Sequence, residues 1–279
     1  MDAAASTFAL SRFVEQVRSV APVAGRAFDV DMLPDGRTTL VVRSMADGQT
    51  GDVAVAGPRT RAHFKNATGV ARAVMLQFKP GWSAPLLGVA TSALTDRIVP
   101  LEDIWGRSGG ELCRELLAAG SVPEVLDRLA RVFTLRARQA ADPASGQLAR
   151  RAVRLLEGGE VRVESVAARL GVTARHLRRV FTESVGIGPK AFARTIRLQR
   201  AVRTAAMSRD WARIAVDAGY CDQAHLIADF RRLVGLTPGA FLKRADRAAG
   251  VGAAAGDDVD EIAEVEAVYH VLQRRPEAP

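Results

Sequence analysis

Short runs in which apolar and polar residues alternate dominate the first third of the chain. Between residues 27 and 78 these runs are separated by turn-forming segments, among them Pro34-Asp35-Gly36 and Gly57-Pro58. A period of two, interrupted by Gly, Pro and Asp, is typical of antiparallel strands joined by tight turns. The clearest strands are expected at residues 38–42, 53–56 and 70–78, so this part is predicted to be β-rich.

Beyond residue 110 the apolar residues recur at helical spacing. Helices are expected at 111–119 and 122–138, and Ser121 is suited to begin the second. Residues 142–146 collect helix breakers, which indicates a linker. The predicted fold class is α+β, with a small antiparallel β-rich N-terminal domain that includes helices, followed by an all-α C-terminal domain. The expected divisions are an N-terminal domain at 1–140, a linker at 141–147, a helical domain at 148–247 and an acidic tail at 248–279.

The helical part contains a repeat with an offset of 49 residues. Five residues recur at this offset: Leu177, Phe181, Gly186, Pro189 and Phe192 correspond to Leu226, Phe230, Gly235, Pro238 and Phe241. A helical solenoid would need about three such units, and only two fit before residue 247. The repeat therefore predicts a pair of equivalent helical units.

Each unit has the spacing of a helix-turn-helix motif. In the first, Ala167 allows two helices to cross closely, Gly171 supplies a positive-φ residue at the turn, and Thr173 can cap the second helix. The second unit repeats this pattern, with Gly219 at the turn and Asp222 as the cap. The second helix of each unit, predicted at 173–185 and 222–234, would be its recognition helix.

Basic residues are concentrated in this part of the chain. The net charge is +8, and residues 146–247 have 20 Lys and Arg against 9 Asp and Glu, whereas residues 248–279 have 2 against 7. Such a basic segment attracts polyanions, most commonly nucleic acid. A general preference for arginine over lysine explains which base is used, but not why it is concentrated in one segment.

The exposed faces of the two predicted recognition helices differ. On the first, Arg175, Arg178 and Arg179 can bind guanine edges or neutralise phosphates, and the sequence does not decide between these roles. On the second, the face carries an amide, small apolar groups and a histidine: Gln223, Ala224, His225 and Ala228. For His225 a DNA contact and a structural role beside an aspartate both remain open. Phosphate contacts are expected at Thr173, Lys190 and Arg231.

Three stretches carry a family resemblance: Ala-Ala-Arg-Leu-Gly-Val-Thr-Ala-Arg-His-Leu-Arg-Arg-Val-Phe (167–181), Ile-Ala-Val-Asp-Ala-Gly-Tyr (214–220) and Gly-Leu-Thr-Pro-Gly-Ala-Phe (235–241). With them, residues 148–247 resemble the AraC/XylS family of bacterial transcription regulators. The resemblance implies two helix-turn-helix units joined by a long helix, at about 189–206, with the recognition helices in successive major grooves of double-stranded DNA. It implies base reading by the residues named above, although Ala228 stands where the family often has arginine. It also implies RNA polymerase as a partner, with activation the commoner mode.

Residues 1–140 resemble a domain of some family members through shorter motifs. These are Leu-Pro-Asp-Gly-Arg-Thr (33–38), Phe-Lys-Pro-Gly (78–81), Leu-Leu-Gly-Val (86–89) and Val-Pro-Leu-Glu-Asp-Ile-Trp-Gly (99–106). In the family this region senses an effector or mediates dimer contacts, so an unidentified small-molecule effector and a homodimer are both implied. Four aromatic residues could line a pocket, but core packing is the commoner role: Phe64, Phe78, Trp82 and Trp105.

Other functional classes find little support in the sequence. Two cysteines, Cys113 and Cys221, are too few for a disulfide framework or a four-cysteine zinc site, and no metal site, cofactor or catalytic residue is expected. No apolar stretch is long enough to span a membrane and no secretory signal is found, which predicts a cytoplasmic protein without a membrane partner. Two alternatives to a sequence-specific regulator stay open, a nonspecific architectural DNA-binding protein and an enzyme with an unrecognised N-terminal active site.

The acidic tail has its own helical pattern at residues 257–275. Its acidic residues come early and its basic residues late, an order that suits the helix dipole. A solvated helix and a segment that docks on the basic domain are both consistent with this pattern.

Overall fold

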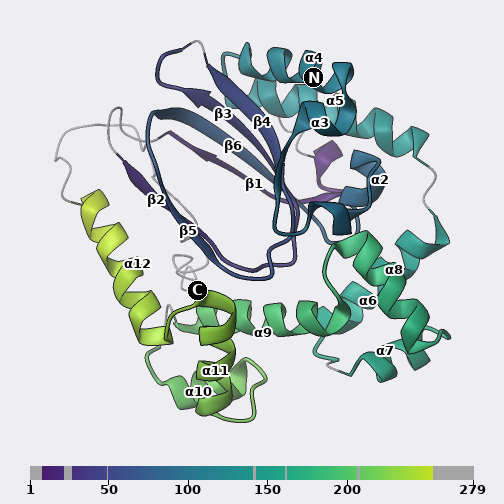
Figure 1. Cartoon of the computed structure of the whole chain (residues 1–279), viewed down its shortest axis with the longest axis vertical. Coiled ribbons are helices and arrows are strands. Elements are labelled where there is room, and N and C mark those ends of the chain that lie inside the picture. The colour runs from purple at the N-terminus through teal and green to yellow at the C-terminus, as the bar shows by residue number, and fades with distance from the viewer. Residues whose placement is uncertain are drawn as a thin grey trace, which may run out of the picture.

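An antiparallel sheet forms the centre of the N-terminal part, and helices follow it along the chain (Figure 1). The computed structural model describes residues 8–21, 27–48, 50–140, 143–160, 162–205 and 208–253. The expected tail helix at 257–275 lies outside the described residues. The α+β fold class predicted from the sequence is confirmed, with the β-rich part first and the helical part second.

The sheet has five strands in the order β1-β6-β3-β4-β7, and all neighbours are antiparallel. Its strands are β1 (Val14–Val20), β3 (Thr39–Met45), β4 (Gly51–Ala56), β6 (Val70–Phe78) and β7 (Ile98–Pro100). A separate ribbon pairs β2 (Phe28–Met32) with β5 (His63–Ala67). In the sheet, Leu40 is paired with both Val55 and Leu76, and all three side chains are fully buried.

The two faces of the sheet differ because successive side chains of a strand point to opposite sides. On β3, Leu40 and Val42 belong to the apolar core, whereas Val41 and Arg43 line a cavity on the opposite face. Strand β6 alternates in the same way, with Val74, Leu76 and Phe78 in the core and Ala73, Met75 and Gln77 at the cavity. The sheet thus separates a core from a cavity.

Helices α4 (Arg107–Leu117) and α5 (Val122–Gln139) supply the other side of the core, together with α2 (Ser83–Leu87), η1 (Thr91–Leu94) and α3 (Leu101–Trp105). Ser121 caps α5 as expected, because its Oγ accepts a hydrogen bond from the Glu124 backbone N–H at 3.4 Å. Phe133 of α5 is fully buried and packs edge-on against Phe78, with ring centroids 5.3 Å apart. Packing of α5 on the sheet therefore fixes the core face.

All the described secondary-structure elements of the C-terminal part are helices. Its helices are α6 (Ala144–Glu157), α7 (Val163–Arg169), α8 (Ala174–Val185), α9 (Pro189–Ala205), α10 (Trp211–Asp217), α11 (Gln223–Val234) and α12 (Pro238–Ala253). They enclose two apolar cores, and in each a pair of rings packs with centroids 5.5 Å apart: Phe181 with Phe192, and Phe230 with Phe241. These are equivalent residues of the 49-residue repeat, so the repeat corresponds to two packed units. Helix α9 runs from one unit to the other (Figure 1).

Several boundaries differ from those expected. Helix α6 begins at Ala144, directly after Pro143, so residues 144–147 of the expected linker form its first turns; proline is compatible with a helix start because it needs no intrahelical N–H bond there. Helix α12 continues to Ala253, past the boundary expected at residue 247. Strands β1, β2, β5 and β7 were not among the strands named from the sequence. Strands β2 and β5 have five residues each and β7 has three, and β1 precedes the segment in which strands were expected.

Candidate DNA interface and interdomain cavity

The first helix-turn-helix unit consists of α7, a turn and α8. Gly171 at the turn has φ +70°, in the left-handed region that disfavours a side chain. The Thr173 Oγ1 accepts a hydrogen bond from the His176 backbone N–H at 3.2 Å and caps α8. Leu177 and Phe181 are fully buried. The turn, cap and buried face of this unit are therefore those predicted from the sequence.

Three arginines occupy the exposed side of α8. Arg175, Arg178 and Arg179 are all exposed. Arg178 forms an ion pair with Glu164 of α7 at 2.5 Å, and Arg179 forms one with Glu183 at 3.4 Å. Arg175 has no carboxylate partner within the part of the chain that the structure describes. The basic face of α8 is thus partly neutralised by its own neighbours.

The second unit consists of α10, a turn and α11. Gly219 at the turn has φ +87°, and the Asp222 Oδ1 accepts a hydrogen bond from the His225 backbone N–H at 2.7 Å. Three of the expected base-reading residues are exposed: Gln223, Ala224 and Ala228. His225 is half-buried, and its ring packs edge-on against Tyr220 with centroids 5.3 Å apart. This contact favours the structural role of His225.

The residues expected to contact phosphates all reach the surface. Lys190 lies in the first turn of α9 and Arg231 in the last turn of α11, and both are exposed. Thr173 is exposed too, and because its oxygen is an acceptor in the helix cap, its hydroxyl proton can still be donated. All three side chains can therefore reach an external phosphate.

A buried ionic cluster fixes α9 to the second recognition helix. Asp229 of α11 is only 6% exposed, and its carboxylate lies 3.2 Å from Arg194 Nε and 3.5 Å from Arg197 Nη2, both on α9. The Arg197 guanidinium also lies over the Tyr220 ring, 4.9 Å from its centroid. Separating a buried carboxylate from its partners is costly, so α11 has a well-defined orientation on α9. The sequence signal for this cluster was an acidic residue on the buried side of α11.

The N-terminal part docks on both units and on α9 between them. The hydrogen bonds that connect them include Thr91 Oγ1 to the Ser184 carbonyl at 2.9 Å, Gln199 Nε2 to the Pro34 carbonyl at 2.7 Å, and the Ala62 N–H to the Leu233 carbonyl at 2.7 Å. The contacts hold α8, α9 and the end of α11 against one surface of the N-terminal part. The relative position of the two recognition helices therefore depends on more than the linker helix.

A buried ion pair joins β2 to α12. Asp31 is 3% exposed, and its carboxylate accepts hydrogen bonds from Arg244 Nη2 to Oδ1 at 2.9 Å and from Nε to Oδ2 at 3.1 Å and Oδ1 at 3.2 Å. Arg244 Nη2 also lies 3.3 Å from Asp29 Oδ2. Bidentate pairs of this kind are both strong and directional, so α12 is held in a fixed orientation on the ribbon.

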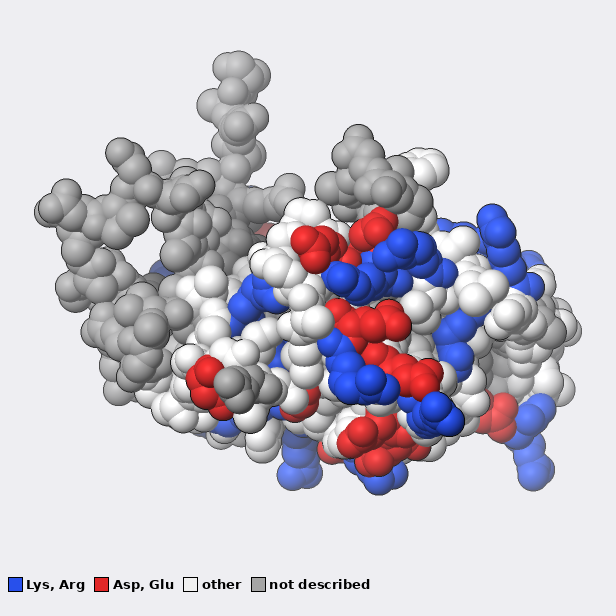
Figure 2. Space-filling model, turned by 90° about the horizontal axis from the view of Figure 1, so that it is seen from above, with Lys and Arg blue, Asp and Glu red and all other residues white. Residues whose placement is uncertain are grey.

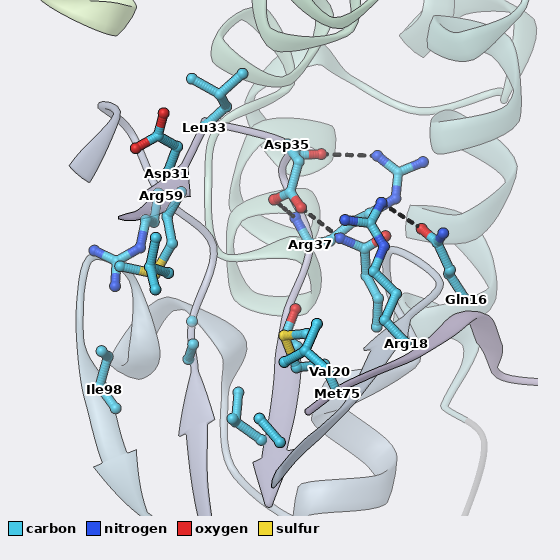
Figure 3. A pocket seen from close by; sticks show the side chains of 18 of the residues that line it. Gln16, Arg18, Val20, Asp31, Leu33, Asp35, Arg37, Arg59, Met75 and Ile98 are labelled. Carbon is cyan, nitrogen blue, oxygen red and sulfur yellow. Dashed lines mark hydrogen bonds between the residues drawn. The ribbon is translucent and has the colours of Figure 1, made fainter. Parts of the chain in front are cut away.

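A cavity of about 560 Å³ lies between the sheet and α9. Its walls come from the second face of the sheet and from the β2–β5 ribbon, and α9 closes one side with four residues: Ile196, Gln199, Arg200 and Arg203. Figure 3 shows Gln16, Arg18, Asp35 and Arg37 gathered on one side, with the apolar side chains of Val20 and Met75 below them. A volume of this size is typical of small-molecule sites, which span roughly 300–1,000 Å³.

Burial perturbs the charged groups of this cavity. It raises the pKa of Asp35 to about 6, against the opposing effect of Arg37, whose backbone N–H donates to Asp35 Oδ1 at 2.9 Å. Burial also lowers the pKa of Arg18. The pKa of Arg203 is lowered by burial first and then by the nearby charges of Arg37 and Arg200. Arg203 therefore lies in a region where positive charge is already in excess.

The sequence did not predict the residues of this cavity. The four candidate aromatic residues pack in the apolar clusters instead and do not line it, so the core interpretation is correct: Phe64, Phe78, Trp82 and Trp105. Polar residues at alternate positions, such as Gln16 and Arg18 of β1, form the lining. In a sequence this alternation has the same appearance whether the polar face meets solvent or an enclosed cavity.

The surface of the N-terminal part carries a mixture of charges, unlike the arginine-rich exposed side of α8. Figure 2, which views the molecule from above relative to Figure 1, shows acidic and basic side chains intermixed on one face. The recognition helices α8 and α11 lie toward the lower part of Figure 1, away from that face.

Among the described residues no group of three or more His, Cys, Asp or Glu side chains is arranged to hold a metal ion, and no described helix is both long and apolar enough to cross a bilayer.

Comparison with known proteins gives two family matches and a set of similar folds. Residues 166–244 match a helix-turn-helix domain, and residues 5–100 match a domain of unknown function (DUF6597). The crystal structure of ToxT from Vibrio cholerae O395 is 10% identical, with a TM-score of 0.42, over 82% of this chain and 96% of that chain. A second structure of ToxT from Vibrio cholerae, in the P21 form, is 10% identical with a TM-score of 0.43, over 82% and 97%. Comparison with curated proteins gives no match.

The family match at residues 166–244 covers α8, α9, α10 and α11, in which the turns, caps and repeated cores were found. This domain type binds DNA in transcription regulators, and the DNA-binding assignment from the sequence is confirmed at that level. The chain therefore carries a helix-turn-helix domain of the AraC type at residues 166–244, behind a domain at residues 5–100 that matches DUF6597.

Proposed function

We propose that the protein is a sequence-specific regulator that inserts α8 and α11 into successive major grooves of double-stranded DNA. One observation carries this proposal: the two helices are equivalent parts of a repeat, and both are attached to the single helix α9. Major grooves on one side of the duplex recur every ~34 Å, and a rigid connection between two recognition helices suits binding at such a fixed interval.

The two helices would read DNA in different ways. Arg175, Arg178 and Arg179 of α8 would contact guanine edges or phosphates. On α11, Gln223 can pair with adenine, while Ala224 and Ala228 can contact a thymine methyl group. Thr173, Lys190 and Arg231 would bind phosphates, and His225 would support α11 through Tyr220 more than it reads a base.

The N-terminal part would control this DNA-binding unit. Its cavity is closed by α9, so a small-molecule effector bound there would contact the helix that connects both recognition helices. The family resemblance supports activation through RNA polymerase, and it supports assembly as a homodimer. In vitro transcription from a recovered promoter, with and without the protein, tests the sign of regulation, and sedimentation velocity tests the dimer.

Selection of genomic DNA fragments followed by footprinting tests the central proposal. We expect a discrete site whose protected bases span two successive major grooves. Arg178→Ala should weaken binding to that site by ~1–3 kcal/mol and relax preference at one base pair. Arg107→Ala removes an exposed arginine of α4, far from α8 along the chain, and is the matched control. Equal weakening of selected and random DNA by Arg178→Ala would instead make Arg178 a phosphate contact.

A nonspecific architectural DNA-binding protein is the second candidate. The excess of 20 basic over 9 acidic residues in 146–247 favours it, because phosphate neutralisation alone gives affinity for any sequence. It predicts uniform recovery of genomic fragments, with a salt dependence that is the same for all of them. The two candidates are therefore separated by the same selection experiment.

A further inference from the structure

Cations outnumber acids around the cavity between the sheet and α9. Seven Lys and Arg residues line it, against four Asp and Glu residues. One of the acids, Asp31, is already bound by Arg244, which is not part of the lining. Two of the cations have carboxylate partners of their own, Arg37 with Glu15 and Arg43 with Asp52.

The remaining imbalance is concentrated in a few residues. Five lining cations form no ion pair among the described residues: Arg18, Arg59, Lys65, Arg200 and Arg203. Arg200 donates a hydrogen bond to the Glu157 backbone carbonyl. Arg18 donates a hydrogen bond to the neutral amide of Gln16 at 2.8 Å, and the Asp35 charge acts on its guanidinium without forming an ion pair. Lys65 has a lowered pKa because of burial first and of the nearby charges of Arg43 and Arg59 second. Positive groups are thus held close together at a cost that an anion would offset.

Most of the remaining lining residues are apolar. Figure 3 shows Val20 and Met75 below the cluster around Arg18, and Ile98 on the opposite side of the cavity. The apolar side chains come from the sheet and the ribbon: Val20, Phe28, Val30, Val41, Met75 and Ile98. An inorganic ion is too small to cover the apolar lining of a cavity of about 560 Å³. The occupant must therefore combine an apolar body with negative charge.

We propose that this cavity binds an organic anion, an apolar body that carries a carboxylate or phosphate group, with the negative charge between Arg18 of β1 and Arg203 of α9. The inference rests on the proposed function, because it names the chemical class of the effector. Arg18 belongs to the N-terminal part and Arg203 to the linker helix, so one anion would join the two parts. A ligand that binds the docked arrangement more tightly shifts the molecule toward it, and DNA binding must be coupled to ligand binding reciprocally.

A pair of fluorescent dyes tests the site. 8-Anilinonaphthalene-1-sulfonate has an aromatic body and one negative charge, and N-phenyl-1-naphthylamine is its neutral counterpart. With the full chain at pH 7, we expect the sulfonate to bind at least ~10-fold more tightly than the neutral dye, because charge-assisted hydrogen bonds to guanidinium groups act on it alone. Displacement by phenylacetate, phenyl phosphate and neutral phenylacetamide then distinguishes a carboxylate from a phosphate ligand.

Variants assign the binding to these residues. Arg18→Gln and Arg203→Gln should each weaken binding of the sulfonate by ~10-fold and leave the neutral dye unchanged. Arg107→Gln, at a side chain that is 94% exposed, should change neither. Near-UV circular dichroism of each variant verifies that the fold is retained. If Arg18→Gln does not fold, Arg18→Lys is compared with Arg203→Gln, because the lysine keeps the charge and should retain binding of the sulfonate.

The outcomes separate this inference from the proposed function. Equal affinity for the two dyes, displacement by the amide as good as by the anions, or equal weakening of both dyes by Arg18→Gln would each overturn the anion site. Charge-selective dye binding by a protein that protects no DNA would support the site and overturn the regulator. A footprint without charge-selective dye binding would do the reverse. DNA affinity that is unchanged by the sulfonate would overturn the coupling through α9.

Discussion

Arg178 illustrates how a residue can be assigned to DNA recognition and yet be engaged within the protein. Its guanidinium pairs with Glu164 of α7, and both side chains are more than half exposed. Exposed pairs of this kind contribute only ~0–1 kcal/mol. Exchange of Glu164 for a phosphate or a guanine should therefore be inexpensive, and we expect Glu164 to lower the affinity of α8 for any DNA.

Replacing Glu164 with Gln should strengthen DNA binding. The substitution releases Arg178 and removes a negative charge that would face the phosphates, so we expect affinity to rise by ~2- to 5-fold. Fluorescence anisotropy with a recovered DNA site measures it. Glu111→Gln breaks a comparable pair with Arg107 on α4 and is the control. Weaker binding of the Glu164 variant would show that this carboxylate positions Arg178 for DNA.

Asp35 gives the stability of the protein a pH dependence of unusual sign. Its pKa is raised by burial from 3.8 to about 6, so the folded state binds a proton more tightly than the unfolded state does. Between those values stability falls as pH rises, and the wild type should lose up to ~3 kcal/mol relative to Asp35→Asn from pH 4 to above pH 6. Thermal melting of both proteins across this range measures the difference, with Asp103→Asn as an exposed-carboxylate control. A difference that does not vary with pH would contradict the burial of this carboxyl.

At the scale of elements, the docking of α9 depends on how closely it approaches the turn before β3. Gly36 in this turn has φ +67°, and a Cβ atom there would lie 2.7 Å from Cδ2 of Phe192, which is fully buried in α9. The turn and the helix therefore fit together only when the turn has no side chain at this position. The same approach brings Gln199 within hydrogen-bonding distance of the Pro34 carbonyl.

Gly36→Ala should loosen this docking. Positive φ alone costs an alanine ~1–2 kcal/mol, and Gly48→Ala, at φ +69° with open space around it, measures that cost by itself. We expect Gly36→Ala to lower the melting temperature more than the control does. It should also speed hydrogen exchange at the Ala62 amide, which bonds to the Leu233 carbonyl across the interface. Equal effects of the two substitutions would show that α9 does not press on the turn.

At the scale of the whole molecule, contacts with the N-terminal part restrict the movement of the two helix-turn-helix units. It is tied to the first unit at Ser184, to α9 at Gln199 and to the end of the second unit at Arg244. These ties are far apart on the helical part, so they constrain rotation of one unit against the other. Under the proposed function, an effector that alters these contacts would change the spacing of the recognition helices without contacting DNA.

Loss of the Asp31–Arg244 pair should free α12 from its contact with the β2–β5 ribbon. Arg244→Met leaves the carboxyl of Asp31, which is 3% exposed, without its guanidinium partner, and we expect destabilisation of ~3 kcal/mol. The double variant Asp31→Asn/Arg244→Met should recover part of the loss, because the uncompensated charge is removed. Denaturant unfolding gives the free energies, and Arg232→Met, at an exposed position of α11, is the control. No recovery in the double variant would contradict a buried charge pair.

The sequence by itself determined the features that depend on near neighbours. The caps at Thr173 and Asp222, the turn at Gly171 and the buried face around Phe181 and Phe230 are short-range properties, because periodicity and capping act within a few residues. The 49-residue repeat shows the same pattern twice, which strengthens the prediction. For this reason the two helix-turn-helix units could be predicted closely, whereas the assignment of DNA-reading residues on them stays a prediction.

Only the tertiary structure decided which polar residues meet. Asp31 and Arg244 are 213 residues apart in the chain, and Gln199 and Pro34 are 165 apart. The alternation in β1, β3 and β6 fixed two faces of a sheet, but nothing in it distinguished an open surface from a cavity closed by α9. Tertiary packing decides between the two. The alternation of side chains depends only on neighbouring residues of a strand, whereas the element that covers a face of the sheet comes from a distant part of the sequence.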